Sequence, residues 1–171
     1  MEGTFFITLD YLKQLGACRE GQREFQRVFP DGGEYQAILD RCADEGRVDF
    51  GSWLLNHIGA TNDVRIYEEK IDAPNRGIIF AGDIKLKAGA NVKFLLSGRG
   101  IEAGRDIEAG DGIKAGWGIK AGQDIEAGKD FCVFAGLNIK KSEWPIFAVV
   151  TAKEKPTNLI SGYWKQRENT L

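Results

Sequence analysis

The side chains that most often carry enzyme chemistry are few in this chain. Its 171 residues include one histidine, His57, and three cysteines, Cys18, Cys42 and Cys132. The cysteines are too widely spaced to indicate a zinc site or a disulfide framework. His57 falls near the expected C-terminal end of a helix, where a charged imidazole is mildly favoured. We therefore predict buried reduced thiols, no catalytic residue, no metal and no cofactor, and we expect that the protein is not an enzyme.

Charged side chains are instead arranged in a repeat between about Ile71 and Ile139. From Gly100 onward it is a plain six-residue unit, in which an isoleucine and an alanine lie two positions apart with a charged residue between them. Residues two apart point to the same side of a strand, so the isoleucine and alanine face inward. The glycine that follows suits a tight corner. So short a unit can bury its isoleucine only by stacking on copies of itself, which predicts a hexapeptide-repeat β-solenoid.

Three such units are expected to form one triangular coil, so that residues 18 apart stack about 4.8 Å from one another. Glu102 would then stack under Lys120, and Lys114 under Cys132. Another face is expected to carry two stacked pairs of like charges, formed by Asp106, Glu108, Asp124 and Glu126. Directly opposed like charges are destabilising. We interpret these carboxylates as a strip that docks on a basic partner; solvent screening and a bound Ca²⁺ are the alternatives.

Trp117 is a second candidate for partner contact. It occupies a corner position at which the other hexads carry polar residues. Corners are usually exposed, and tryptophan is enriched in binding hot spots. Packing of Trp117 against Leu137 or the C-terminal tail is the alternative.

The segment before the repeat predicts a small helical module. Apolar residues recur at three- and four-residue spacing between residue 8 and about residue 60, which indicates four short helices. Thr8 can cap the first helix, and Gly32 and Gly33 follow the second. Helices this short need packing partners. We expect the module to cap the open end of the solenoid, with partner binding as the alternative.

The predicted fold class is therefore α+β, with a helical module at residues 1–62 and a β-solenoid at residues 63–152. Residues 153–171 are expected to form a C-terminal tail or cap. Within this scheme, residues 146–151 predict a further strand, and Tyr163 and Trp164 are expected to fold back over the C-terminal end.

Composition narrows the classes of partner. The net charge of −2 is unlike that of a general nucleic-acid binder, which needs a basic excess. No apolar run reaches the roughly 18 residues of a membrane span, and the start of the chain lacks the pattern of a signal peptide. We therefore expect a cytoplasmic protein with neither nucleic acid nor membrane as a direct partner.

Two sequence features together resemble those of a known group of proteins. They are the helical segment Leu12-Lys13-Gln14-Leu15-Gly16-Ala17-Cys18 and the hexads of the Asp-Ile-Glu-Ala-Gly type from Ile101 to Gly128. This combination is similar to small phage- and prophage-encoded accessory proteins. The resemblance implies a β-helix fold and a counter-defence role in the host cytoplasm, such as binding and blocking a bacterial immune effector. If that effector is a CRISPR–Cas component, the protein is anti-CRISPR-like. It transfers no catalytic residue.

We therefore expect a non-enzymatic, protein-binding inhibitor that docks on a bacterial effector with a basic surface. Two alternatives stay open. A hexapeptide-type acyltransferase, which resembles the left-handed β-helix enzymes, would need a histidine base near a coil, whereas His57 precedes the repeat. A structural, self-assembling homo-oligomer of the bactofilin type would join solenoids through their terminal strands.

Overall fold

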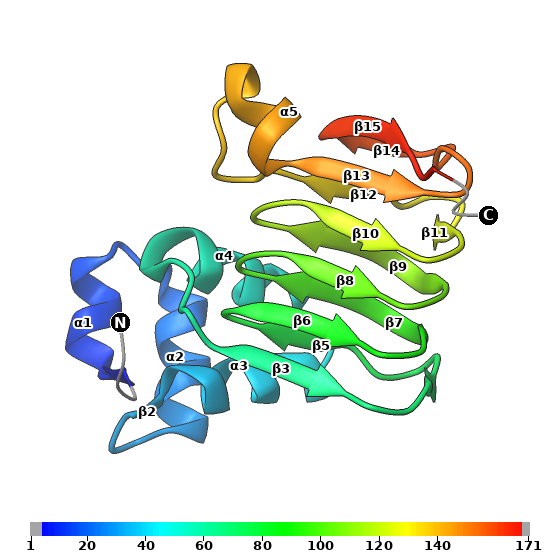
Figure 1. The fold of residues 1–171 in the computed structure, drawn as a ribbon. Helices are drawn as coiled ribbons and strands as arrows, with labels where there is room; N and C mark the ends of the chain where they lie inside the picture. Colours follow the sequence, from blue (N-terminus) through cyan, green and yellow to red (C-terminus); the bar gives the residue numbers. More distant parts are fainter. Residues whose placement is uncertain (1–4, 169–171) are drawn as a thin grey trace.

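The computed structural model describes residues 5–168, which form a helical module followed by a parallel β-solenoid (Figure 1). The predicted α+β class is confirmed. No helix within residues 5–168 is long and apolar enough to cross a bilayer.

The first two helices of the N-terminal module begin at residues whose side chains cap them. The Thr8 hydroxyl accepts a hydrogen bond from the Tyr11 amide at 3.2 Å, as predicted for the first helix. The Cys18 sulfur accepts one from the Gly21 amide at 3.4 Å at the start of the second. The helices are α1 (Leu9–Gln14), α2 (Arg19–Val28), α3 (Tyr35–Asp44) and α4 (Val48–Ile58). A short antiparallel ribbon holds the start of the chain against the start of α3; it consists of β1 (Phe6–Ile7) and β2 (Gly33–Glu34).

The solenoid has three faces of parallel strands, numbered here in the order in which the chain visits them. The first face contains β3 (Val64–Tyr67), β6 (Asp83–Leu86), β8 (Ile101–Ala103), β10 (Ile119–Ala121), β13 (Val149–Ala152) and β15 (Tyr163–Gln166). The second face contains β4 (Ile71–Ala73), β11 (Ile125–Ala127) and the first parts of β7 (Ala90–Ser97) and β9 (Ile107–Ala115). The third face contains β5 (Ile78–Phe80), β12 (Val133–Ala135), β14 (Leu159–Ser161) and the last parts of β7 and β9. β7 and β9 thus continue around the corner between the second and third faces.

Strand register follows the sequence period where the hexads are regular. Ile101 pairs with Ile119, and Ile107 with Ile125, in each case 18 positions further along the chain. The inward isoleucines and alanines are buried in one continuous core. This register is the one expected for three hexads in each coil.

The register changes after β11. Val133 stacks on Ile113, and Phe134 stacks on Lys114. The prediction that Lys114 stacks under Cys132 is therefore wrong. The corner between Gly128 and Cys132 is longer than the corners between regular hexads, and it moves the next strand along the sequence.

The C-terminal part of the solenoid also differs from the prediction. Residues 146–151 do not form one strand, because α5 (Trp144–Phe147) occupies the first of these positions and β13 begins at Val149. Tyr163 and Trp164 lie in β15, which pairs parallel to β13, and Trp164 packs against the solenoid core. Within residues 153–171, for which a tail or cap is predicted, β14 and β15 pair with strands of the solenoid.

The helical module packs on the outer side of the third face, over β5 and the end of β7 (Figure 1). Ile79, Phe94 and Leu96 are buried there together with apolar residues of the helices. Gln36 of α3 also covers the edge of β5: its side-chain amide donates to the Ile79 carbonyl at 2.9 Å and accepts from the Ala81 amide at 3.0 Å. These are the bonds that a further strand would make, so Gln36 caps this edge of the sheet.

Candidate functional site

The side chains considered for catalysis do not form a cluster. His57 is exposed in the last turn of α4, with its ring stacked on Trp53 at 4.0 Å between centroids and its Nδ1 2.8 Å from the Trp53 carbonyl oxygen. Burial raises the pKa of the Cys42 thiol to about 12, so this thiol is protonated at neutral pH and a poor nucleophile. Cys18 is exposed and Cys132 half-buried, so the prediction of buried thiols is confirmed for Cys42 and wrong for Cys18. Within the described residues, no group of three His, Cys, Asp or Glu side chains is placed to hold a metal ion.

The second face presents an acidic column, which we define as Asp72, Asn91, Glu108 and Glu126. Each pairs with the next across neighbouring strands. Asn91 donates a hydrogen bond from its side-chain amide to the Asp72 carboxylate at 2.9 Å. Glu108 and Glu126 are exposed and directly opposed, as predicted. In the part of the chain that is described, no ion pair joins a carboxylate of this column to a basic side chain.

Asp106 and Asp124 lie at the corner where the chain enters this face, and both are half-buried. The Asp106 carboxylate accepts a hydrogen bond from the Asp124 backbone amide at 3.2 Å. Asp83 makes the same contact with the Gly100 amide at 2.9 Å on another corner. An aspartate just before the inward isoleucine thus links one coil to the next. The structural role of Asp106 leaves Glu108 and Glu126 as the more accessible members of the predicted strip.

Trp117 lies on a different corner, between the third and first faces. Its side chain is 38% exposed. The Arg99 guanidinium carbon is 4.2 Å from the centre of the indole ring, and the Phe147 ring is 6.3 Å away between centroids. Trp117 therefore packs beside α5. The structure brings the four predicted carboxylates together on one side of the solenoid and places Trp117 on another, so they form two separate surfaces.

A third candidate site lies within the helical module. It is concave, and the sequence did not predict it. A hollow of about 320 Å³ separates α2 from α3 and α4. Its floor is apolar and contains Leu12, Phe25, Ile38, Cys42, Phe50, Trp53 and Leu54. In the sequence these residues form ordinary apolar stripes at helical spacing. A tightly packed helix interface and one that leaves a hollow need the same spacing, so the sequence does not distinguish them.

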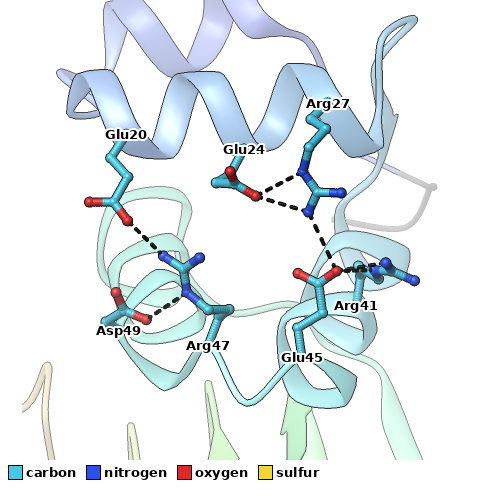
Figure 2. Close-up of polar contacts among 7 residues, drawn as sticks. All are labelled: Glu20, Glu24, Arg27, Arg41, Glu45, Arg47 and Asp49. Atoms are coloured by element: carbon cyan, nitrogen blue, oxygen red, sulfur yellow. Dashed lines mark hydrogen bonds and ion pairs between the residues drawn. The ribbon is translucent and has the colours of Figure 1, made fainter.

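Charged side chains span the gap between α2 and the other two helices (Figure 2). Arg47, whose guanidinium carbon lies 3.8 Å from the centre of the Phe50 ring, contacts Glu20 of α2 at 3.3 Å. Arg27 of α2 contacts Glu45 at 3.7 Å. Further ion pairs along the rim are Arg27–Glu24 at 2.9 Å, Arg41–Glu45 at 2.6 Å and Arg47–Asp49 at 3.6 Å. The hollow is therefore bordered by a network in which three arginines and four carboxylates contact one another.

Comparison with known proteins finds a family match for the helical module and none for the solenoid. Residues 1–61 match the family described as the YdhT N-terminal domain. Neither the curated proteins nor the solved structures contain a match to this chain. The matched segment ends where the helices end, before β3 begins. The helical module is thus similar to a domain that is defined in its own right.

Proposed function

We propose that this protein is a non-enzymatic binding protein that docks on a basic protein surface through the acidic column. The observation that carries the proposal is the stacking of Glu108 on Glu126, exposed on a face where no basic side chain among the described residues pairs with them. A partner with lysine or arginine side chains would relieve this repulsion. The carboxylates sit on a hydrogen-bonded solenoid, so little conformational entropy would be lost when they bind.

At a finer level, we propose a phage-encoded, anti-CRISPR-like counter-defence protein that acts in the bacterial cytoplasm. Effectors that bind nucleic acids have basic surfaces, because they neutralise phosphates. An acidic face of fixed spacing is complementary to such a surface and would also speed the encounter of the two proteins. Support for phage origin comes from the resemblance of the repeat and the helical segment.

The test is affinity capture from bacterial lysates that contain the major immune effectors, followed by calorimetry with the captured protein. The test variant is Glu108→Lys/Glu126→Lys. The matched control is Glu102→Lys/Glu143→Lys, which makes the same change in net charge on other surfaces. We expect the test variant to weaken binding at least tenfold and the control to bind within about threefold of wild type. Binding should also weaken as salt is raised, because these charges are exposed.

Capture of no effector by the wild type, or equal loss of binding by both double variants, would reject the docking strip. A captured effector must also be inhibited in its own activity for the counter-defence role to hold. The enzymatic alternative requires His57: if an acyltransferase activity were found, His57→Ala should abolish it.

Self-assembly is the second candidate, because β15 is the outermost strand of the first face among the described residues. An outermost strand can pair with a strand of another molecule. Analytical ultracentrifugation over a hundredfold range of concentration tests this: a constant sedimentation coefficient argues against assembly, and a rising one supports it.

A further inference from the structure

The hollow in the helical module has the size and lining of a ligand site. Its volume of about 320 Å³ falls at the lower end of the range of roughly 300–1,000 Å³ typical of small-molecule sites. Aromatic rings of Phe25, Phe50 and Trp53 contribute to its walls. Such a concave apolar surface is favourable for an apolar molecule because burial removes apolar surface of both from water.

The charges at the mouth select against an ionic ligand. Arg27, Arg41 and Arg47 each contact a carboxylate already, and four carboxylates (Glu20, Glu24, Glu45 and Asp49) face these three guanidinium groups. An anion would have to displace one of these carboxylates and would still lie near the others. A cation would likewise have to displace an arginine from the carboxylate that the arginine contacts. An uncharged molecule leaves every pair intact.

The same ion pairs limit the shape of the occupant. The Arg47–Glu20 and Arg27–Glu45 contacts both join α2 to the opposite wall (Figure 2). A helix of a partner protein is about 10 Å or more in diameter with its side chains and could not enter without separating both pairs. An alkyl chain or a single aromatic ring is narrower than a helix and is the kind of occupant that these contacts favour.

We propose that this hollow is a binding site for an uncharged apolar small molecule of the alkyl or aromatic class. The site belongs to the helical module and lies apart from the acidic column, so it does not depend on the proposed docking function. Failure of one proposal leaves the other standing.

The test compares 1-decanol with decanoate, which share an alkyl chain and differ in charge. Binding to the full chain is measured by isothermal titration calorimetry, and its place by chemical-shift changes in ¹H–¹⁵N NMR spectra. We expect decanol to bind at least tenfold more tightly than decanoate. The shifted amides should be those of α2, α3 and α4.

Gly21 offers a variant that fills the hollow and a matched control that does not. A Cβ atom placed on Gly21 would lie 3.6 Å from the Cys18 sulfur and 3.7 Å from the Phe50 ring, which are ordinary contacts. Gly21→Leu adds an alkyl group within the hollow and should weaken decanol binding at least tenfold. Gly21→Ala adds only a methyl group and should bind within about threefold of wild type.

Three results would overturn the proposal. They are the absence of decanol binding up to its solubility, decanoate binding as tight as that of decanol, and shifts that lie in the solenoid instead of the module. Should Gly21→Leu fail to fold, the two ligands and the NMR spectra of the wild type still decide the question.

Discussion

Replacement of Gln36 by alanine should strongly destabilise the junction between module and solenoid. The Gln36 side chain satisfies the Ile79 carbonyl and the Ala81 amide, whose residues are 0% and 1% exposed. An unsatisfied buried backbone group costs about 1–3 kcal/mol. Two such groups give about 2–6 kcal/mol, and we expect about 2–4 kcal/mol because water can partly enter the space that the side chain leaves. This is a large part of the roughly 5–15 kcal/mol that stabilises a typical domain.

Urea unfolding, followed both by circular dichroism and by tryptophan fluorescence, measures the loss. Hydrogen exchange of the Ala81 amide reports the bond directly and should be faster in Gln36→Ala. The control is Gln26→Ala, since Gln26 is exposed on α2 and should change the free energy of unfolding by less than about 0.5 kcal/mol. A loss below about 0.5 kcal/mol in Gln36→Ala, with exchange of the Ala81 amide as in wild type, would refute the role of Gln36 as an edge cap.

Three further predictions follow from single contacts. Gly128→Ala should destabilise by about 2 kcal/mol or more, because a Cβ there would clash with the Gly110 carbonyl oxygen. Gly110→Ala, whose Cβ would have its nearest contact at 3.7 Å, should cost less than about 1 kcal/mol in the same urea titration. Burial raises the Cys42 pKa from 9.0 to about 12, so unfolding above pH 9 releases a proton and the free energy of unfolding should fall as pH rises. In Cys42→Ala the free energy of unfolding should fall less steeply between about pH 9 and pH 10. Glu126→Lys should stabilise by about 0.2–0.5 kcal/mol at low salt, because it converts the stacked like charges with Glu108 into an opposite pair, and the gain should shrink in 1 M NaCl.

The regular hexads could be predicted from sequence because their strands have one inward and one outward side. In Ile101-Glu102-Ala103 the two apolar residues are buried and Glu102 is exposed, which is the alternation that the strand period requires. The stacking of Glu102 with Lys120 and of Glu108 with Glu126 follows from the same period. Prediction failed at Lys114, because the length of the corner before Val133 is set by local turn geometry that the hexad period does not contain.

The candidate sites were only partly predictable. Sequence period alone placed Asp106, Glu108, Asp124 and Glu126 on one side. It could not show that the Asp106 carboxylate accepts a backbone hydrogen bond, because that contact depends on the corner conformation. The hollow beside α2 depends on how far apart the helices settle, which apolar spacing does not determine.

The position of the helical module can nevertheless be argued from two departures from the hexad. Ile78-Ile79-Phe80 and Phe94-Leu95-Leu96 are apolar at all three positions, whereas regular hexads carry a charge in the middle. Such strands must be buried on both sides, since the outward residue would otherwise expose a large apolar surface. The core of the solenoid covers Ile78 and Leu95, and the helices cover Ile79 and Leu96. On the next coil the residue that stacks on Leu96 is Lys114, whose charge interrupts the apolar outer surface of the third face before Phe134 on the coil that follows.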